Sequence, residues 1–195
     1  MPTRRASCRL PSAKATWPPR PSEPPNTAEK GREMSDDLKY LRDRADLTDL
    51  INEYATGIDT RDWTLYRSIF ADEVDIDFSS YSGVPGSRMK GDDWAAGVQQ
   101  MLPGFDATQH LLANMVFDIR GDEATVTVYM QAEHFLPNNL GDSSHTLGGY
   151  YTHQIRRGPD GWKIHGTRLT VTWSRGNRHV YELARQRVAE RNKAG

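Results

Sequence analysis

Residues 124–134 alternate apolar and polar side chains without a break. Alternation with a period of two is typical of a β-strand that buries one face and leaves the other outside. His134 falls in phase with the apolar face, where a histidine must find a polar partner or line a pocket. We therefore expect His134 to be either a site residue or a partnered core residue. The other members of its face are Ala124, Val126, Val128, Met130 and Ala132.

The second half of the chain continues in strands. "FDIRGDEATVTVYM" predicts a hairpin that turns at Gly121-Asp122, and "THQIRRGPDGWKIHG" predicts another that turns at residues 158–161. A further strand is expected from Trp162 to about Trp173. An earlier strand, "DEVDIDF" at 72–78, is followed by a loop at 80–87 that is rich in glycine and proline.

Helical patterns dominate the first half. Acidic residues after Ser35 suit a helix start, and apolar residues from Leu47 to Ile58 follow helical spacing. A short helix is expected around 63–70, a third at 91–102, and a charged helix closes the chain at about 177–192. Helices grouped early and strands grouped late predict an α+β fold, with helices packed on one face of a curved antiparallel sheet. Such a sheet can enclose an apolar pocket at its open end.

Residues 1–33 differ from the rest of the chain. They hold seven of the eleven prolines and carry seven Lys/Arg against three Glu. This composition favours extended, solvated chain. We expect a disordered Pro/Arg-rich leader over 1–33, which the working protein need not contain, and one domain over 34–195. A weak similarity to an organelle transit peptide is the alternative, but proline pairs oppose the amphipathic helix that such peptides need.

Composition narrows the function classes. The only cysteine, Cys8, lies in the leader, so the domain can have neither a disulfide framework nor a cysteine nucleophile. A net charge of −1 gives no reason to expect nucleic acid. No apolar run reaches the roughly 20 residues that a membrane-spanning helix needs. We expect a soluble cytoplasmic protein whose domain holds no cysteine-ligated metal or cluster.

Both faces of the strand that contains His110 are largely apolar. One face carries His110, Leu112, Asn114 and Val116, and the other carries Leu111, Ala113, Met115 and Phe117. A strand of this kind is covered on both sides. We expect the helices and the pocket to cover the inner face of this strand. An apolar outer face indicates that a second copy of the chain packs there.

Asp59 lies just past the apolar stripe of the first helix, five residues after Tyr54. A carboxylate there can accept a hydrogen bond from one ring nitrogen of a histidine and leave the other nitrogen free as a base. The sequence alone does not bring Asp59 and His110 together. The plainer reading is that Asp59 ends a helix, that Tyr54 is a core residue with a hydrated hydroxyl, and that His110 is a core histidine.

The order and spacing of several short motifs resemble the SnoaL-like branch of the NTF2-like superfamily. These motifs are "YATGIDTRDW" (54–63), "FADEVDIDF" (70–78), "TQH" (108–110) and "GGYYTHQIRRGPDGWKI" (148–164). The resemblance covers nearly all of 36–175. It implies a cone-shaped fold and, from members such as scytalone dehydratase, bile acid 7α-dehydratase and hexachlorocyclohexane dehydrochlorinase, a cofactor-independent lyase that binds a small apolar cyclic molecule.

The roles of site residues in the resembled family members can be assigned to single positions of this sequence. The resemblance implies that Asp59 and His110 form the catalytic pair, with His134 and Tyr54 as additional polar groups. Phe78 and Tyr151 replace polar residues of scytalone dehydratase, which makes scytalone an unsuitable substrate. The dehydrochlorinase arginine falls near Arg156 or Arg157. The expected substrate-binding residues are Phe78, Trp63, Trp94, Met130, Tyr151 and Asn114.

Three functions stay open. A dehydratase would use His110 to remove a proton next to a carbonyl, with Asp59 orienting the imidazole. An isomerase or polyketide cyclase would begin with the same proton abstraction. A non-catalytic module would only bind a small molecule. A metal site at Asp59, His110 and His134 is disfavoured, because no histidine pair has helical metal-ligand spacing. His145, His153, His165 and His179 are expected to be solvated or structural.

Overall fold

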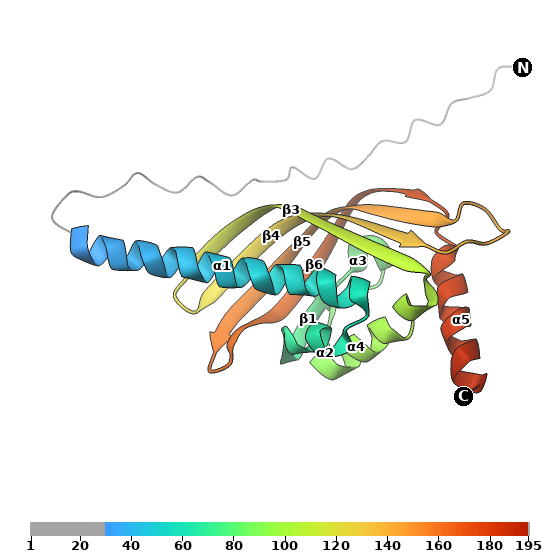
Figure 1. Cartoon of the computed structure of the whole chain (residues 1–195), viewed down its shortest axis with the longest axis horizontal. Helices are drawn as coiled ribbons and strands as arrows, with labels where there is room; N and C mark the ends of the chain where they lie inside the picture. The colour runs from blue at the N-terminus through green and yellow to red at the C-terminus, as the bar shows by residue number, and fades with distance from the viewer. Residues whose placement is uncertain (1–29, 195) are drawn as a thin grey trace, which may run out of the picture.

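The computed structural model describes residues 30–194, with side chains from residue 35 onward. Helix α1 lies along one face of a curved sheet that stays open at both edges (Figure 1). The α+β fold is thus confirmed. In chain order the elements are α1 (Lys30–Thr60), α2 (Trp63–Ser68), β1 (Phe70–Asp77), α3 (Ser79–Ser82), β2 (Ser87–Lys90), α4 (Gly91–Gln99), the 3-10 turn η2 (Leu102–Gly104), β3 (Ala107–Arg120), β4 (Glu123–Phe135), β5 (Ser144–Gly158), β6 (Gly161–Gly176) and α5 (Val180–Ala194).

Within the described residues, the sheet has the strand order β2-β1-β6-β5-β4-β3. Strands β3 to β6 pair with their chain neighbours in antiparallel fashion, as the hairpin signals predict. The expectation of a wholly antiparallel sheet is wrong at one place, because β1 runs parallel to β6. No hairpin joins these two strands, so no local turn signal could have set their relative direction.

Helix α1 buries the predicted apolar stripe against the sheet. Leu47, Ile51 and Tyr54 are each no more than 1% exposed. The helix begins at Lys30, so the start expected at Ser35 is wrong. The last proline before α1 is Pro25, so nothing in the intervening sequence breaks a helix. The predicted disordered leader otherwise lies outside the described residues.

The region between β1 and α4 contains more regular structure than the sequence indicates. The expected loop at 80–87 begins as the single helical turn α3, which ends at Gly83 in the left-handed conformation (φ 74°). The short strand β2 follows and pairs with β1. The third helix ends at Gln99 rather than at residue 102, and Leu102–Gly104 forms a separate 3-10 turn.

The alternation of β4 is confirmed: every second residue from Ala124 to His134 is buried. Strand β3 departs from its expected phase. A bulge between Ala113 and Val116, with Asn114 at φ 52°, shifts the register. Met115 and Phe117 therefore pack against the core, whereas the exposed Asn114 cannot line an interior site. The predicted phase of β3 after Ala113 is wrong for this reason, and Asn114 lies outside the interior where we expected it to bind substrate.

His153 lies in the core between β4 and β6. It is fully buried, its Nδ1 is 3.1 Å from Thr167 Oγ1, and its Nε2 has no partner among the described residues. The rings of Tyr54 and Tyr151 lie 5.4 and 5.5 Å away. Burial lowers the pKa of His153 to about 3. The burial of His153 fits the expectation that it is a structural residue.

Because the unfolded chain protonates histidine near pH 6.5 and the folded chain resists protonation down to about pH 3, His153 makes folding less favourable as the pH falls through this window. We expect His153→Phe to reduce the loss of stability between about pH 7.5 and pH 5.5 by roughly 1 kcal/mol. Urea unfolding at the two pH values measures this loss. His179→Phe, at an exposed position, is the control and should leave the loss unchanged. An equal pH dependence in His153→Phe and wild type would contradict the assignment.

Candidate active site

Asp59 lies at the end of α1 and faces the beginning of β3. Its Oδ1 is 2.8 Å from His110 Nδ1, and its Oδ2 accepts a hydrogen bond of 2.7 Å from the backbone N–H of His110. One carboxylate thus holds both the ring and the backbone of the same histidine. The His110 side chain is 5% exposed and that of Asp59 is 22% exposed, so the contact is largely shielded from water.

Two further residues complete this network. The Thr108 hydroxyl donates to Asp59 Oδ1 over 2.9 Å, and Arg61 Nη1 donates to Thr108 Oγ1 over 2.7 Å. Arg61 follows α1 in the left-handed conformation (φ 62°), and its guanidinium also donates to the carbonyl of Ile58. The sequence analysis missed both residues. Period two in β3 places Thr108 beside His110 and could have indicated it, whereas no sequence signal indicates the role of Arg61.

The surroundings keep Asp59 ionised. Burial alone would raise its pKa, but hydrogen bonds and charge attraction from His110, together with the Thr108 hydroxyl, hold the pKa below its ordinary value. An ionised carboxylate on Nδ1 favours the tautomer that carries its proton there. His110 Nε2 makes no hydrogen bond to any described residue, so it is the nitrogen that can receive a proton.

His134 lies next to this pair. The two imidazole rings have their centroids 5.7 Å apart and meet edge to face. His134 is 4% exposed, so the prediction from its strand phase that it points inward is confirmed. Its Nδ1 is 2.9 Å from the hydroxyl of Tyr181, a residue of α5 that the sequence analysis did not single out. Burial first, and the neighbouring His110 and His145 next, lower the pKa of His134 to about 3.

The expected substrate-binding aromatic residues form an interior cluster. Phe78 lies 5.2 Å from Trp94 and 6.3 Å from Tyr151, measured between ring centroids. Tyr54 lies 5.2 Å from Tyr151 and is 1% exposed, so its hydroxyl is buried rather than hydrated. Burial raises the pKa of Tyr54 well above its ordinary value, so this phenol can donate a hydrogen bond but cannot serve as a base. Met130 lies in the same core, and Trp63 packs at its margin.

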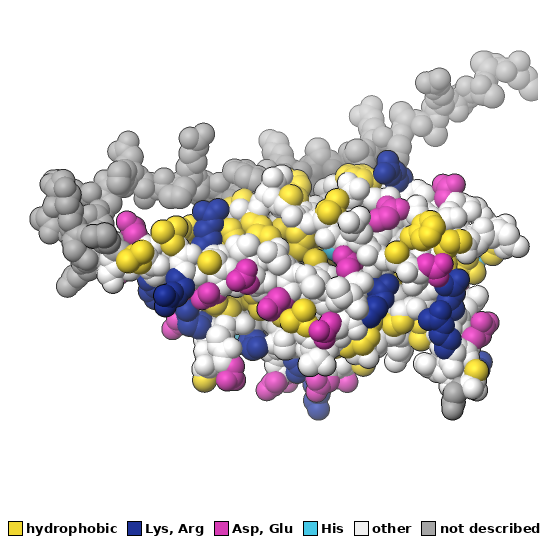
Figure 2. Space-filling view, in the orientation of Figure 1, with side chains coloured by type: hydrophobic (Ala, Val, Ile, Leu, Met, Phe, Trp, Pro, Cys, Tyr) yellow, Lys and Arg dark blue, Asp and Glu magenta, His cyan; other side chains and the backbone are white. Residues whose placement is uncertain are grey.

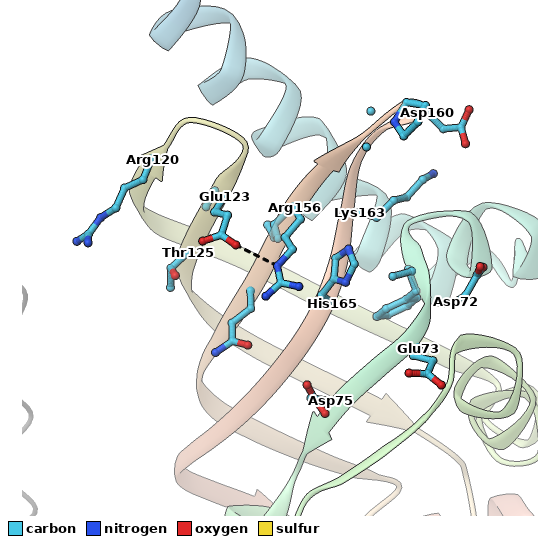
Figure 3. Close-up of a pocket in the computed structure, with 18 of the residues that line it drawn as sticks. Asp72, Glu73, Asp75, Arg120, Glu123, Thr125, Arg156, Asp160, Lys163 and His165 are labelled. Atoms are coloured by element: carbon cyan, nitrogen blue, oxygen red, sulfur yellow. Dashed lines mark ion pairs between the residues drawn. The ribbon is translucent and has the colours of Figure 1, made fainter.

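The two arginines proposed by resemblance lie away from the Asp59–His110 pair. Arg157 forms ion pairs with Asp43 and Asp122 and stacks on the ring of Trp162 at 4.1 Å. Arg156 faces the outer side of the sheet, where it pairs with Glu123 (Figure 3). Neither arginine therefore takes the place that the dehydrochlorinase resemblance suggested near 156–157. Arg61 is the arginine that joins this network, through its hydrogen bond to Thr108.

Two hollows stand out on the outer face of the sheet, the face away from α1. The larger, of about 890 Å³, is lined by charged residues of both signs, among them Asp75, Arg120 and Lys163 (Figure 3). The smaller, of about 390 Å³, borders it near Asp77. Neither is lined by Asp59, His110 or His134. The enclosed pocket beside His110 stays a prediction. On the α1 side, Figure 2 shows a small area of histidine surface next to hydrophobic and acidic side chains.

Comparisons with known proteins place this arrangement in a family. Residues 39–168 match the SnoaL-like domain. An uncharacterized protein of Mycobacterium tuberculosis is 29% identical over 127 residues, which cover 64% of this chain and 82% of the relative. The crystal structure of the Kfla4162 protein from Kribbella flavida is 30% identical, covers 73% of this chain and 99% of its own, and superposes with a TM-score of 0.70.

Several similar structures have a named activity, and dehydrochlorinases are among them. Hexachlorocyclohexane dehydrochlorinase from Novosphingobium barchaimii is 19% identical, covers 73% of this chain and 94% of its own, and has a TM-score of 0.61. At this identity the likeness concerns the fold. Among the described residues, no helix has both the length and the apolar character needed to cross a membrane. With two thirds of its length matched to one family, the chain belongs to the SnoaL-like domain family.

Proposed function

We propose that this protein is a cofactor-independent lyase of the dehydratase type, with His110 as the base. The observation that carries the proposal is the pairing of His110 with Asp59, whose carboxylate binds both the ring Nδ1 and the backbone N–H of this histidine. A histidine held at two points, with its second nitrogen unpaired, is arranged for proton transfer.

The mechanism begins with a C–H bond next to a carbonyl of the substrate. His110 Nε2 takes this proton, and the electron pair moves towards the carbonyl oxygen. The ionised Asp59 stabilises the imidazolium that forms and keeps its orientation. The electron pair then forms the C=C bond as the C–O bond to the neighbouring hydroxyl breaks. His110 returns its proton to the departing hydroxyl, which leaves as water, so the enzyme ends in its starting state.

The carbonyl oxygen needs a hydrogen-bond donor while it carries negative charge. His134 is the best-placed candidate, because its ring lies 5.7 Å from that of His110 and stays neutral through burial. A neutral imidazole can donate a hydrogen bond to an enolate without giving up its proton. Tyr54, whose phenol stays protonated, is a second candidate donor from the aromatic cluster.

Two alternatives use the same residues. An isomerase or polyketide cyclase would return the proton to a different carbon or form a ring, and the first step would be the same. A non-catalytic binding module would bind a small molecule in the aromatic cluster without converting it. The apolar lining that we propose for a cyclic substrate consists of Trp63, Phe78, Trp94, Met130 and Tyr151.

A panel of steroid, terpenoid and aromatic ketone alcohols tests the proposal. Thermal shift finds the ligands, and mass spectrometry then detects loss of water. We expect His110→Gln and Asp59→Asn each to lower kcat by about 10²- to 10⁴-fold, because each removes part of the acid–base pair. Asp93→Asn, which removes an exposed carboxylate from α4, should retain wild-type turnover.

Two outcomes would contradict this mechanism. Full turnover of a ligand by His110→Gln would show that another group is the base. Tight binding of several ligands without turnover by wild type would favour the binding module. In either case, retained ligand-induced thermal shifts in the variants show that the fold survives the substitutions.

We also propose that two copies of the chain associate through the outer face of the sheet. Large apolar side chains are exposed there: Leu111 is 55% exposed, Tyr129 is 43% exposed and Trp173 is 45% exposed. Acidic and basic residues lie together in the larger hollow of the same face, so a second copy related by a two-fold axis can match unlike charges. Association would remove these apolar side chains from water.

Light scattering after gel filtration tests the association. Wild type is expected at twice the 22.1 kDa of one chain, and Leu111→Arg is expected as a monomer because it places a charge in the apolar contact. Leu38→Arg is the matched control, since Leu38 is 63% exposed on α1 rather than on the sheet. A monomeric wild type, or a dimeric Leu111→Arg, would contradict the proposal.

A further inference from the structure

We propose that Tyr181 of α5 is a positioning residue: its hydroxyl donates to Nδ1 of His134 and thereby keeps the imidazole proton on Nε2. His134 can then donate a hydrogen bond from Nε2 to a substrate oxygen. The assignment of the proton stands on the contacts of Tyr181 alone. Its use on a substrate rests on the proposed function.

Tyr181 sits in a pocket of aromatic and histidine rings. Its own ring lies 4.8 Å from that of His134, 5.4 Å from His145 and 5.4 Å from Phe105, between centroids. The residue is 4% exposed, so water does not compete for its hydroxyl. The hydroxyl oxygen is 2.9 Å from His134 Nδ1 and 3.4 Å from His145 Nδ1.

Two assignments of hydrogens fit these distances: the Tyr181 hydroxyl donates to His134 Nδ1 and accepts from His145 Nδ1, or both directions are reversed. The first follows from donor strength. A phenol O–H is a good donor and a neutral imidazole nitrogen is a good acceptor, so the shorter contact is O–H donating to His134 Nδ1. The longer contact is then His145 Nδ1–H donating to the Tyr181 oxygen. Each group is used once, and no buried polar hydrogen at this junction faces another. The proton of neutral His134 is left on Nε2.

The result is two imidazoles that are both held through Nδ1 but by different partners. His110 Nδ1 lies against the carboxylate of Asp59, and His134 Nδ1 lies against the neutral phenol of Tyr181. Burial keeps His134 neutral, with a pKa of about 3. The different partners give the neighbouring rings different roles: His110 accepts a proton, and His134 donates a hydrogen bond.

Helix α5 is packed so that Tyr181 can hold this position. Val180, Ala184 and Val188 are buried on one side of the helix, which lies against η2 at the end of the sheet (Figure 1). Gly104 makes a close approach possible, because a Cβ at this position would lie 2.0 Å from the carbonyl oxygen of Ala184. A methyl group at residue 104 would therefore push α5, and Tyr181 with it, away from His134.

Ring-nitrogen NMR of protein labelled with 15N-histidine tests the proposal, because the nitrogen shifts separate a protonated from an unprotonated nitrogen. The His134 signals are assigned by their loss in His134→Gln. We expect wild type at neutral pH to show the His134 proton on Nε2. Tyr181→Phe, which keeps the ring but removes the hydroxyl, should move a large part of the population to the Nδ1–H form.

Two further variants sharpen the test. Tyr66→Phe is the matched control: it removes a buried hydroxyl that accepts from Trp94 Nε1 rather than contacting a histidine, and it should leave the His134 signals unchanged. Gly104→Ala keeps the Tyr181 hydroxyl but displaces α5, and should shift the population as Tyr181→Phe does. A wild-type spectrum with the proton on Nδ1, or a Tyr181→Phe spectrum identical to wild type, would overturn the proposal.

This readout is independent of turnover. If the tautomer behaves as expected and wild type turns over no ligand, the positioning role stands and the proposed function fails. If a ketone is turned over, Tyr181→Phe should lower kcat by about tenfold with little change in KM, because the hydrogen bond to the enolate strengthens in the transition state. An unchanged kcat beside an altered tautomer would overturn the use of His134 on the substrate.

Discussion

The bond between Asp59 and His110 joins the end of α1 to the edge strand β3, and the rest of the site is arranged around it. Because Oδ2 of Asp59 binds the backbone N–H of His110, the carboxylate fixes the strand as well as the ring. The Thr108 hydroxyl donates a further hydrogen bond to this carboxylate, and Arg61 donates to Thr108. A partly buried charge is tolerated here because each oxygen of the carboxylate has at least one donor.

Local patterns predicted much of this structure, and the failures have definite causes. Alternation placed His134 on the inner face of β4, and helical spacing placed Tyr54 inside. The same reasoning failed at Asn114, because a bulge breaks the period of two and sequence gives no sign of it. It also failed for the direction of β1 against β6, which tertiary packing decides.

The site itself shows where sequence reasoning ends. The Asp59–His110 pair followed from family resemblance, and the fold brings the two residues within 2.8 Å. Tyr181 could not be found this way, because its contacts with His134 and His145 depend on how α5 docks against η2, at a sequence separation of 47 and 36 residues. The resemblance aligned the dehydrochlorinase arginine near Arg156 or Arg157, but neither lies at the site. Arg156 faces the outer side of the sheet, and Arg157 forms an ion pair with Asp43.

The most direct test of proton transfer by this pair is hydrogen exchange into a bound ketone in D2O, followed by NMR or mass spectrometry. This measurement reports removal of the proton whether or not elimination or isomerisation follows. The account predicts that wild type exchanges the C–H next to the carbonyl, and that His110→Gln binds the ketone but does not exchange it. Equal exchange by wild type and His110→Gln, or binding by wild type without exchange, would contradict it.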